Sequence, residues 1–139
     1  DDYVKDLKKT LGEELITPTR IYAKTIINLL RDFSLHGMSH ITGGGLVDNI
    51  ERILPQGCMA QLKTMSWEIP PIFSFLQEQG GLDQSEMFRA FNNGIGMVLL
   101  VAEEDADDIM LRLKGLKEKA FVIGEIVEQT EKGERIAFS

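Results

Sequence analysis

Three consecutive glycines at 43–45 stand between a short apolar stretch and a segment with helical spacing, and they constrain the fold more than any other feature of the sequence. Each glycine inside a regular element costs roughly 0.5 to 1 kcal/mol relative to alanine, because glycine loses more backbone freedom on folding. Residues 35–41 fit a short strand, and Leu46 and Ile50 lie on one face of a following helix. The sequence therefore predicts a strand, a glycine turn and a helix in that order.

A glycine turn that leads into a helix can bind an anion. Without side chains, the backbone approaches a ligand closely and directs N–H groups toward it, and the helix start adds about half a positive charge. Thr42 contributes a hydroxyl beside the turn, and His40 contributes a titratable ring. These neighbours favour an anion site over a tight turn without ligand. His40 is then either a general acid or base, or a structural histidine bonded to the backbone.

The remaining patterns predict several further helices and strands. Residues 1–16 are charged and weakly patterned, which predicts an incoming linker with at most a short helix around residues 3–11. Thr17 followed by Pro18 predicts a helix start, because a hydroxyl cap precedes a residue whose missing N–H is not needed there. Strands are predicted at 58–63, 94–102, 120–129 and 134–138, and helices at 72–79, 85–92 and 103–119.

The order of these elements predicts the fold class. The most apolar run, residues 94–102, is interpreted as a central strand, and the last two strands as a hairpin around Glu131, Lys132 and Gly133. Helices and strands mix without βαβ repetition, which favours an α+β fold with a mixed, mostly antiparallel sheet and helices packed on it.

Composition excludes several classes of function. The net charge of −7 disfavours nucleic acid and anionic membranes as partners, although a local anion site remains compatible with it. Cys58 is the only cysteine, which indicates a reducing, cytosolic compartment, and no apolar run is long enough for a membrane span. His36, His40 and Cys58 lack the paired spacing of zinc ligands, and the acidic residues at 103–108 lack a calcium-loop pattern, so we predict no metal site.

Four segments in this order carry a resemblance to a known family. They are TPTRIYAKTI, HGMSHITGGGLVDNIERILP, WEIPPIF and EMFRAFNNGIGMVL, and they resemble the C-terminal half of phosphoribosylformylglycinamidine cyclo-ligase, also called aminoimidazole ribonucleotide synthetase. The likeness runs from about Leu15 to the end, with an H-x-TGGG segment and an FN-x-G-x-GM segment. It implies a C-terminal domain over residues 17–139, with a mixed, mostly antiparallel sheet between helical layers, partly ferredoxin-like. Residues 1–16 would be the linker from an N-terminal ATP-binding domain.

The resemblance also implies an activity. The family closes the imidazole ring of formylglycinamidine ribonucleotide in purine biosynthesis, giving aminoimidazole ribonucleotide, ADP and phosphate. ATP and Mg²⁺ would be held mainly by the N-terminal domain, which also supplies a homodimer interface, so the 139 residues alone are expected to be inactive. A second hypothesis is a non-catalytic anion-binding or interaction module. A third is a paralogue such as formylglycinamidine synthetase or selenophosphate synthetase.

Site residues follow from the matched segments. His40 is expected to bind or protonate the reacting group, and Asn92 to orient substrate, whereas Asn93 is given no role. Arg20 is a possible phosphate contact or a structural ion pair. The residues expected to hold a phosphate or line that site are Thr42, Gly43, Gly44, Gly45 and Gly94.

Overall fold

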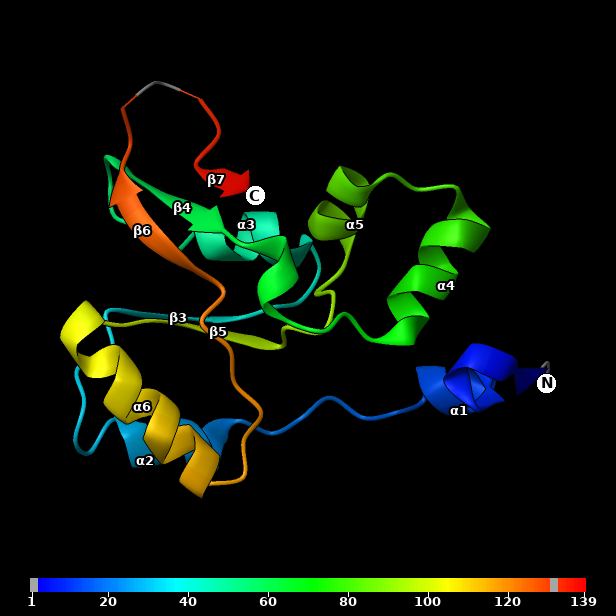
Figure 1. Ribbon diagram of the computed structural model, residues 1–139, viewed down its shortest axis with the longest axis horizontal. Coiled ribbons are helices and arrows are strands. Elements are labelled where there is room, and N and C mark those ends of the chain that lie inside the picture. The colour runs from blue at the N-terminus through cyan, green and yellow to red at the C-terminus, as the bar shows by residue number, and fades with distance from the viewer. Residues whose placement is uncertain (1–2, 131–132) are drawn as a thin grey trace.

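A two-stranded ribbon between two hydrophobic cores organises the computed structural model, which describes residues 3–130 and 133–139 (Figure 1). The ribbon pairs β3 (Gly37–His40) antiparallel with β5 (Met97–Leu100). Alternate side chains of β5 face opposite sides, so Val98 belongs to the larger core and Leu99 packs against the smaller one. The 94–102 run is apolar because both faces of β5 are covered. In the described residues β5 pairs only with β3, so the prediction of a central strand is wrong in its pairing.

The larger core lies under a three-stranded sheet. β4 (Cys58–Leu62) is its middle strand, paired antiparallel with β6 (Gly124–Glu128) and parallel with β7 (Ile136–Phe138). Helix α3 (Gly45–Glu51) contacts this sheet and also packs against α5 (Gln84–Ala90). The buried members of this core include Leu46, Ile50, Ala60, Leu62, Phe88 and Ile136.

A smaller core lies on the other face of the ribbon. It is formed where α2 (Ala23–Leu29) packs against α6 (Glu103–Gly115). Leu29 of α2 is fully buried there, together with Ile109 and Leu113 of α6. The packing of α2 on α6 therefore sets the position of the segment before α2 relative to the end of β3.

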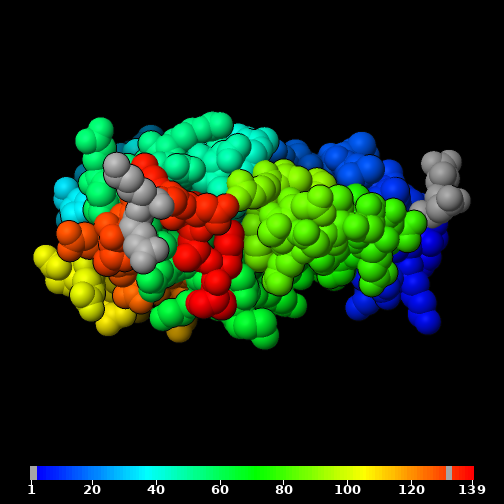
Figure 2. Space-filling model, turned by 90° about the horizontal axis from the view of Figure 1, so that it is seen from above, coloured from blue at the N-terminus to red at the C-terminus, as the bar shows by residue number. Residues whose placement is uncertain are grey.

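Helix α4 and a short N-terminal unit lie toward one end of the molecule. α4 (Pro71–Gly80) precedes α5, and a 3₁₀ turn η2 (Thr64–Ser66) follows β4. Figure 2 shows an elongated molecule with the N-terminal segment at one end. That segment consists of β1 (Tyr3–Val4), η1 (Lys5–Leu7), β2 (Lys9–Thr10) and α1 (Leu11–Leu15), so residues 3–15 carry more structure than a linker with one short helix.

The predicted helix start at Thr17 and Pro18 is wrong. The Thr17 hydroxyl donates to the carbonyl of Glu13 at 3.2 Å, at the end of α1, and α2 begins only at Ala23. Residues 17–22 between them have no regular structure. The Thr17 hydroxyl therefore bonds to the end of α1, and α2 begins without a side-chain cap.

The predicted hairpin of the last two strands is also wrong. Both strands form, but β4 lies between β6 and β7, so these strands do not pair with each other. Of the predicted turn, Glu131 and Lys132 lie outside the described residues. β4 carries Ala60 and Leu62 into the core and is paired on both edges. The short connection between the last two strands does not by itself indicate that a third strand lies between them.

The other predicted elements are confirmed. The strand at 35–41 and the helix after the glycines occur as β3 and α3, and the later helices occur as α4, α5 and α6. The α+β class is confirmed, with mixed and antiparallel pairing distributed over small sheets. In the part of the chain that the structure describes, no helix has the length and apolarity needed to cross a membrane.

Candidate functional site

Two of the three glycines are required by the backbone itself. Gly44, the N-terminal cap of α3, has φ 93°, and Gly45 has φ 57°, both in the left-handed region that side chains disfavour. A Cβ on Gly44 would lie 2.7 Å from a carboxylate oxygen of Asp48. A Cβ on Gly45 would overlap with the carbonyl oxygen of Phe88, because α3 packs closely on the end of α5. The fold therefore accounts for these two positions without any ligand.

Gly43 has no such structural reason. It is exposed, its φ is not positive, and a Cβ there would meet nothing within 4 Å. A side chain at this position would project into open space beside the turn. Gly43 is thus the one glycine of the three that the packing of the chain does not demand.

Asn49 of α3 holds the turn in place. The residue is 4% exposed, and its side-chain amide nitrogen donates to the carbonyls of Gly45 at 2.8 Å, Gly43 at 3.1 Å and Thr42 at 3.3 Å. Its own backbone carbonyl accepts the hydroxyl of Ser39 at 2.7 Å, which ties the helix to β3. Asn49 is not among the site residues predicted from the sequence, although its place one helical turn after the glycines is the signal that could have identified it.

The Asn49 contacts decide which way the peptides of the turn face. In a trans peptide the carbonyl of one residue and the N–H of the next point in opposite directions. Because the carbonyls of Thr42 and Gly43 are directed at Asn49, the N–H groups of Gly43 and Gly44 are directed away from it. Within residues 3–130 and 133–139, neither N–H donates to a protein acceptor. The turn therefore offers two adjacent free donors.

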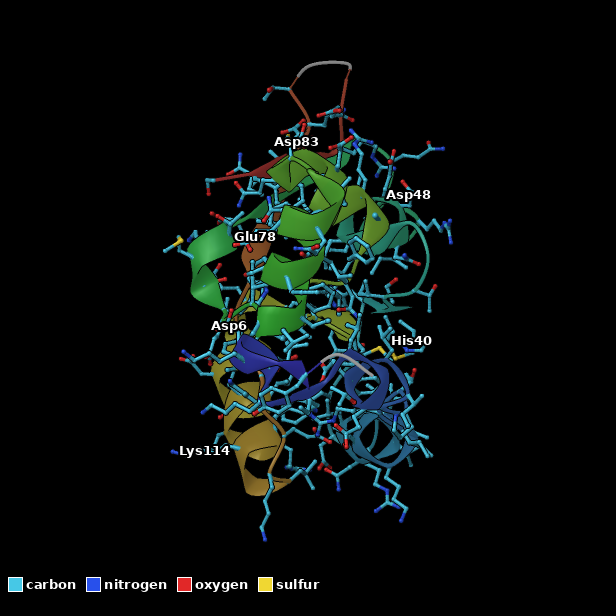
Figure 3. The ribbon with its side chains drawn as sticks, turned by 90° about the vertical axis from the view of Figure 1, so that its right-hand side faces the viewer. Asp6, His40, Asp48, Glu78, Asp83 and Lys114 are labelled. Atoms are coloured by element: carbon cyan, nitrogen blue, oxygen red, sulfur yellow. The ribbon has the colours of Figure 1, made fainter. Side chains whose placement is uncertain are left out.

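His40 lies at the end of β3, next to the turn. Its side chain is exposed, and its ring contacts Tyr22 edge-on, with the ring centroids 5.9 Å apart and the planes at 62°. In Figure 3 His40 and Asp48 lie along the same side of the molecule. The acidic side chain of Asp48 beside Gly44 places a negative charge next to the free donors.

The second motif segment meets the first through the ribbon. The N–H of Ile41 donates to the carbonyl of Gly96 at 2.9 Å, so the residue after His40 is bonded to the segment that begins at Asn92. The Asn92 side-chain oxygen accepts the N–H of Gly94 at 2.9 Å, which closes a tight turn. In the described residues its amide nitrogen has no protein partner.

Asn93, which was predicted to have no role, is buried and holds the backbone of that segment in place. It is 2% exposed, has φ 48°, and its amide nitrogen donates to the carbonyls of Met87 and Phe91. Its carbonyl accepts the indole N–H of Trp67 at 2.9 Å. Asn93 therefore shapes the backbone on which Asn92 and Gly94 sit, and Gly94 itself has φ 95° beside Pro70.

Arg20 forms the ion pair that the sequence left open as an alternative. Its guanidinium lies 2.6 Å from a carboxylate oxygen of Glu118, just beyond α6. The other carboxylate oxygen of Glu118 accepts the hydroxyl of Thr25 at 2.7 Å. A phosphate contact for Arg20 stays a prediction.

The described residues do not form a metal centre. Among them no group of three or more His, Cys, Asp or Glu side chains is close enough to hold a metal ion. The donors at the glycine turn are N–H groups, which favour an anion.

Comparison with known proteins identifies the family of this domain. The family model "AIR synthase related protein, C-terminal domain" matches residues 1–136. The chain belongs to this family. The AIR synthase related C-terminal domain is thus the unit that carries the glycine turn, His40 and the Asn92 segment.

Curated relatives with this domain are cyclo-ligases. The chain is 56% identical over 128 residues to a phosphoribosylformylglycinamidine cyclo-ligase of Citrifermentans bemidjiense, covering 92% of this chain and 37% of the relative. It is 55% identical over 134 residues to one of Syntrophotalea carbinolica, covering 96% and 38%. It is 51% identical over 139 residues to one of Syntrophus aciditrophicus, covering 100% and 40%. The chain therefore spans well under half the length of these relatives.

Solved structures support the fold. The Escherichia coli hydrogenase maturation protein HypE matches with a TM-score of 0.66 at 23% identity, over 90% of this chain and 37% of that one. A second HypE structure gives 0.61 at 24% identity, over 92% and 40%. At this identity the likeness shows a shared fold and nothing about function.

Proposed function

We propose that the chain is the C-terminal, substrate-side part of a phosphoribosylformylglycinamidine cyclo-ligase. The complete enzyme would close the imidazole ring of formylglycinamidine ribonucleotide to aminoimidazole ribonucleotide, with ATP converted to ADP and phosphate, in purine biosynthesis. The observation that carries the proposal is the identity of 51 to 56% to curated cyclo-ligases over 92 to 100% of the chain. The contact between the His40 and Asn92 segments supports it.

The proposed chemistry explains why a phosphate site is needed beside a proton-transferring group. An amide oxygen is a poor leaving group, and transfer of the ATP γ-phosphoryl group to the formamide oxygen makes it a good one. An amidine nitrogen then attacks the same carbon, the C–O bond breaks, and phosphate departs. His40 is exposed next to the turn, where it can bind the reacting group or exchange a proton with it.

The glycine turn is proposed to hold a phosphate group of the substrate or of the nucleotide. The free N–H groups of Gly43 and Gly44 are the donors, the hydroxyl of Thr42 adds to them, and the amide nitrogen of Asn92 orients substrate nearby. The carboxylate of Asp48 lowers the affinity of this turn for a free anion. We therefore expect the turn to position a phosphate that belongs to a larger ligand, held also by other contacts.

Partners of the complete protein belong to the same proposal. ATP and Mg²⁺ would be bound mainly outside this domain. The substrate is a small molecule, and we propose a cytoplasmic homodimer without nucleic-acid or membrane partners. Analytical ultracentrifugation of the complete enzyme measures the assembly.

His40→Ala in the complete enzyme tests the proposal, with His36→Ala as the matched control. Both histidines are exposed and lie four residues apart, but His36 precedes β3 and lies outside the motif. General acid or base groups contribute about 10² to 10⁴ in rate, so His40→Ala should lower the rate of ring closure by at least about 10²-fold. His36→Ala should leave it within about twofold. Equal rates for the two variants would refute the role of His40, and no ring closure by the unaltered enzyme would refute the function.

A further inference from the structure

Tyr22 is the aromatic partner of the proposed catalytic histidine. The side chain of His40 is exposed at the end of β3. The Tyr22 ring packs edge-on against it at a centroid distance of 5.9 Å. An exposed imidazole at a strand end can occupy several staggered rotamers, and this ring contact favours one of them.

The Tyr22 hydroxyl packs closely against the backbone of Gly96. A Cβ on Gly96 would overlap with that hydroxyl oxygen, and it would lie 3.1 Å from the ring carbon that bears it. The carbonyl of Gly96 accepts the N–H of Ile41, the residue after His40. Tyr22 therefore lies across both strands of the ribbon at the end where the glycine turn begins. Glycine at 96 is explained by this close approach.

The carboxylate of Glu118 binds one residue before Tyr22 and one residue after it in the sequence. Glu118 binds Arg20 through one oxygen at 2.6 Å and the hydroxyl of Thr25 through the other at 2.7 Å. These partners lie two residues before and three residues after Tyr22. Tyr22 is also the N-terminal cap residue of α2 and makes no side-chain cap hydrogen bond.

The energetics favour a positioning role for this carboxylate. The Arg20 side chain is 57% exposed, and exposed ion pairs contribute little to stability. The Glu118 side chain is only 18% exposed, and both its oxygens are used. The two bonds of the planar Glu118 carboxylate hold Arg20 and Thr25 and so determine the path of the chain between these residues, which carries Tyr22.

We propose that Tyr22 is a positioning residue for His40, and that Glu118, through Arg20 and Thr25, places Tyr22. This inference rests on the proposed function, since it assigns the ring contact to the orientation of the reacting histidine. Arg20 then acts on the site through the backbone, by its ion pair with Glu118. The three motif segments PTRIY, H-x-TGGG and FN-x-G-x-GM meet at this contact.

A spectroscopic experiment tests the positioning independently of activity. His36 and His40 are the only histidines of the chain, so their imidazole proton resonances in an NMR spectrum are assigned by single substitutions. Tyr22→Leu removes the aromatic ring, and Glu118→Gln weakens the ion pair. Both should shift the His40 resonance and leave that of His36 in place. Tyr3→Leu, at the other tyrosine of the chain, should shift neither.

Rates in the complete enzyme supply the second readout. Displacing a reacting group by about 1 Å costs up to 10²-fold, so Tyr22→Leu should lower kcat at least about tenfold, with KM within about threefold. Tyr22→Phe keeps the ring and should restore kcat to within about threefold. Unchanged His40 resonance and unchanged kcat in Tyr22→Leu would overturn the positioning role. If His40→Ala also retained full rate, the proposed function of His40 would fail separately.

A second variant keeps the test decisive if Tyr22→Leu does not fold. Gly96→Ala should displace the Tyr22 hydroxyl, shift the His40 resonance and lower kcat. Combining it with Tyr22→Phe removes the overlapping oxygen and leaves the ring carbon at 3.1 Å, so both effects should become smaller. If the effects of Gly96→Ala were the same with tyrosine and with phenylalanine at position 22, the close packing of the Tyr22 hydroxyl on Gly96 would be disproved.

Discussion

Replacing Asn49 with alanine is expected to lower the free energy of unfolding by about 2 to 3 kcal/mol, because one buried amide holds three carbonyls of the glycine turn. Its –NH₂ group has two hydrogens, so it forms two full hydrogen bonds, to Gly45 at 2.8 Å and Gly43 at 3.1 Å, and a weaker third to Thr42 at 3.3 Å.

The magnitude follows from these contacts. Two net hydrogen bonds contribute about 1 kcal/mol each, and a carbonyl left without a partner costs about 1 kcal/mol more when water can reach part of it, as at exposed Gly43. The carbonyl of Thr42 keeps the N–H of Gly45 at 3.1 Å. Alanine favours the helix over asparagine by about 0.5 kcal/mol, which offsets part of the loss.

Urea denaturation of the chain, followed by circular dichroism, measures this change. With m of about 1 to 3 kcal/mol/M, the midpoint should fall by about 0.7 to 3 M. The thermal midpoint should fall by about 6 to 15 °C, since 1 kcal/mol corresponds to about 3 to 5 °C at this chain length. Asn28→Ala is the matched control, because its side chain accepts one hydrogen bond, from Arg112, and its loss should stay below about 1 kcal/mol. A loss in Asn49→Ala no larger than in Asn28→Ala would refute the bracing of the turn.

Two further predictions concern the glycine turn and acid stability. Gly43→Val should leave the unfolding midpoint nearly unchanged and raise KM for the phosphate-bearing ligand of the complete enzyme about tenfold or more. Gly45→Ala should lower the free energy of unfolding by about 2 to 4 kcal/mol, because of its left-handed φ and the overlap with Phe88. A stable Gly45→Ala or an unstable Gly43→Val would contradict the different roles assigned to these two glycines. Asp83 caps α5, and the hydrogen bond from the Glu86 backbone, helped by the Ser85 hydroxyl, holds the pKa of Asp83 below its usual 3.8. A lowered folded-state pKa gives stability that is present above the unfolded pKa and lost as pH falls through the folded value, so Asp83→Asn should unfold with a shallower dependence on pH below about 4, and an unchanged acid profile would contradict this.

Much of the fold was readable from local patterns. The strand before the glycines, the helix after them and the three later helices follow from hydrophobic spacing and from turn residues. Strand pairing was not readable, because an apolar run of a given length is compatible with any neighbour. The hairpin expected at the C-terminus therefore gave way to a sheet in which β4 separates β6 from β7.

The site divides in the same way. The residues of the turn, with His40 and Asn92, were predicted from composition and resemblance, since each is a short polar or glycine motif. Asn49, Asn93, Tyr22 and Glu118 were not, because their roles are contacts between segments. The Glu118 carboxylate, for example, binds a side chain 98 residues away in the chain.

The sequence by itself determined that residues 43–45 form a turn between a strand and a helix, and which chemical groups surround it. Only the tertiary structure decided which constraint acts on each of the three glycines. Gly45 is fixed by the approach of α5 and Gly44 by its left-handed backbone, while Gly43 remains open to solvent. Asn49 turns two N–H groups outward, and this depends on a side chain folding back over the turn. Backbone preferences are local, but burial and hydrogen-bond direction are set by segments that meet only in the folded chain.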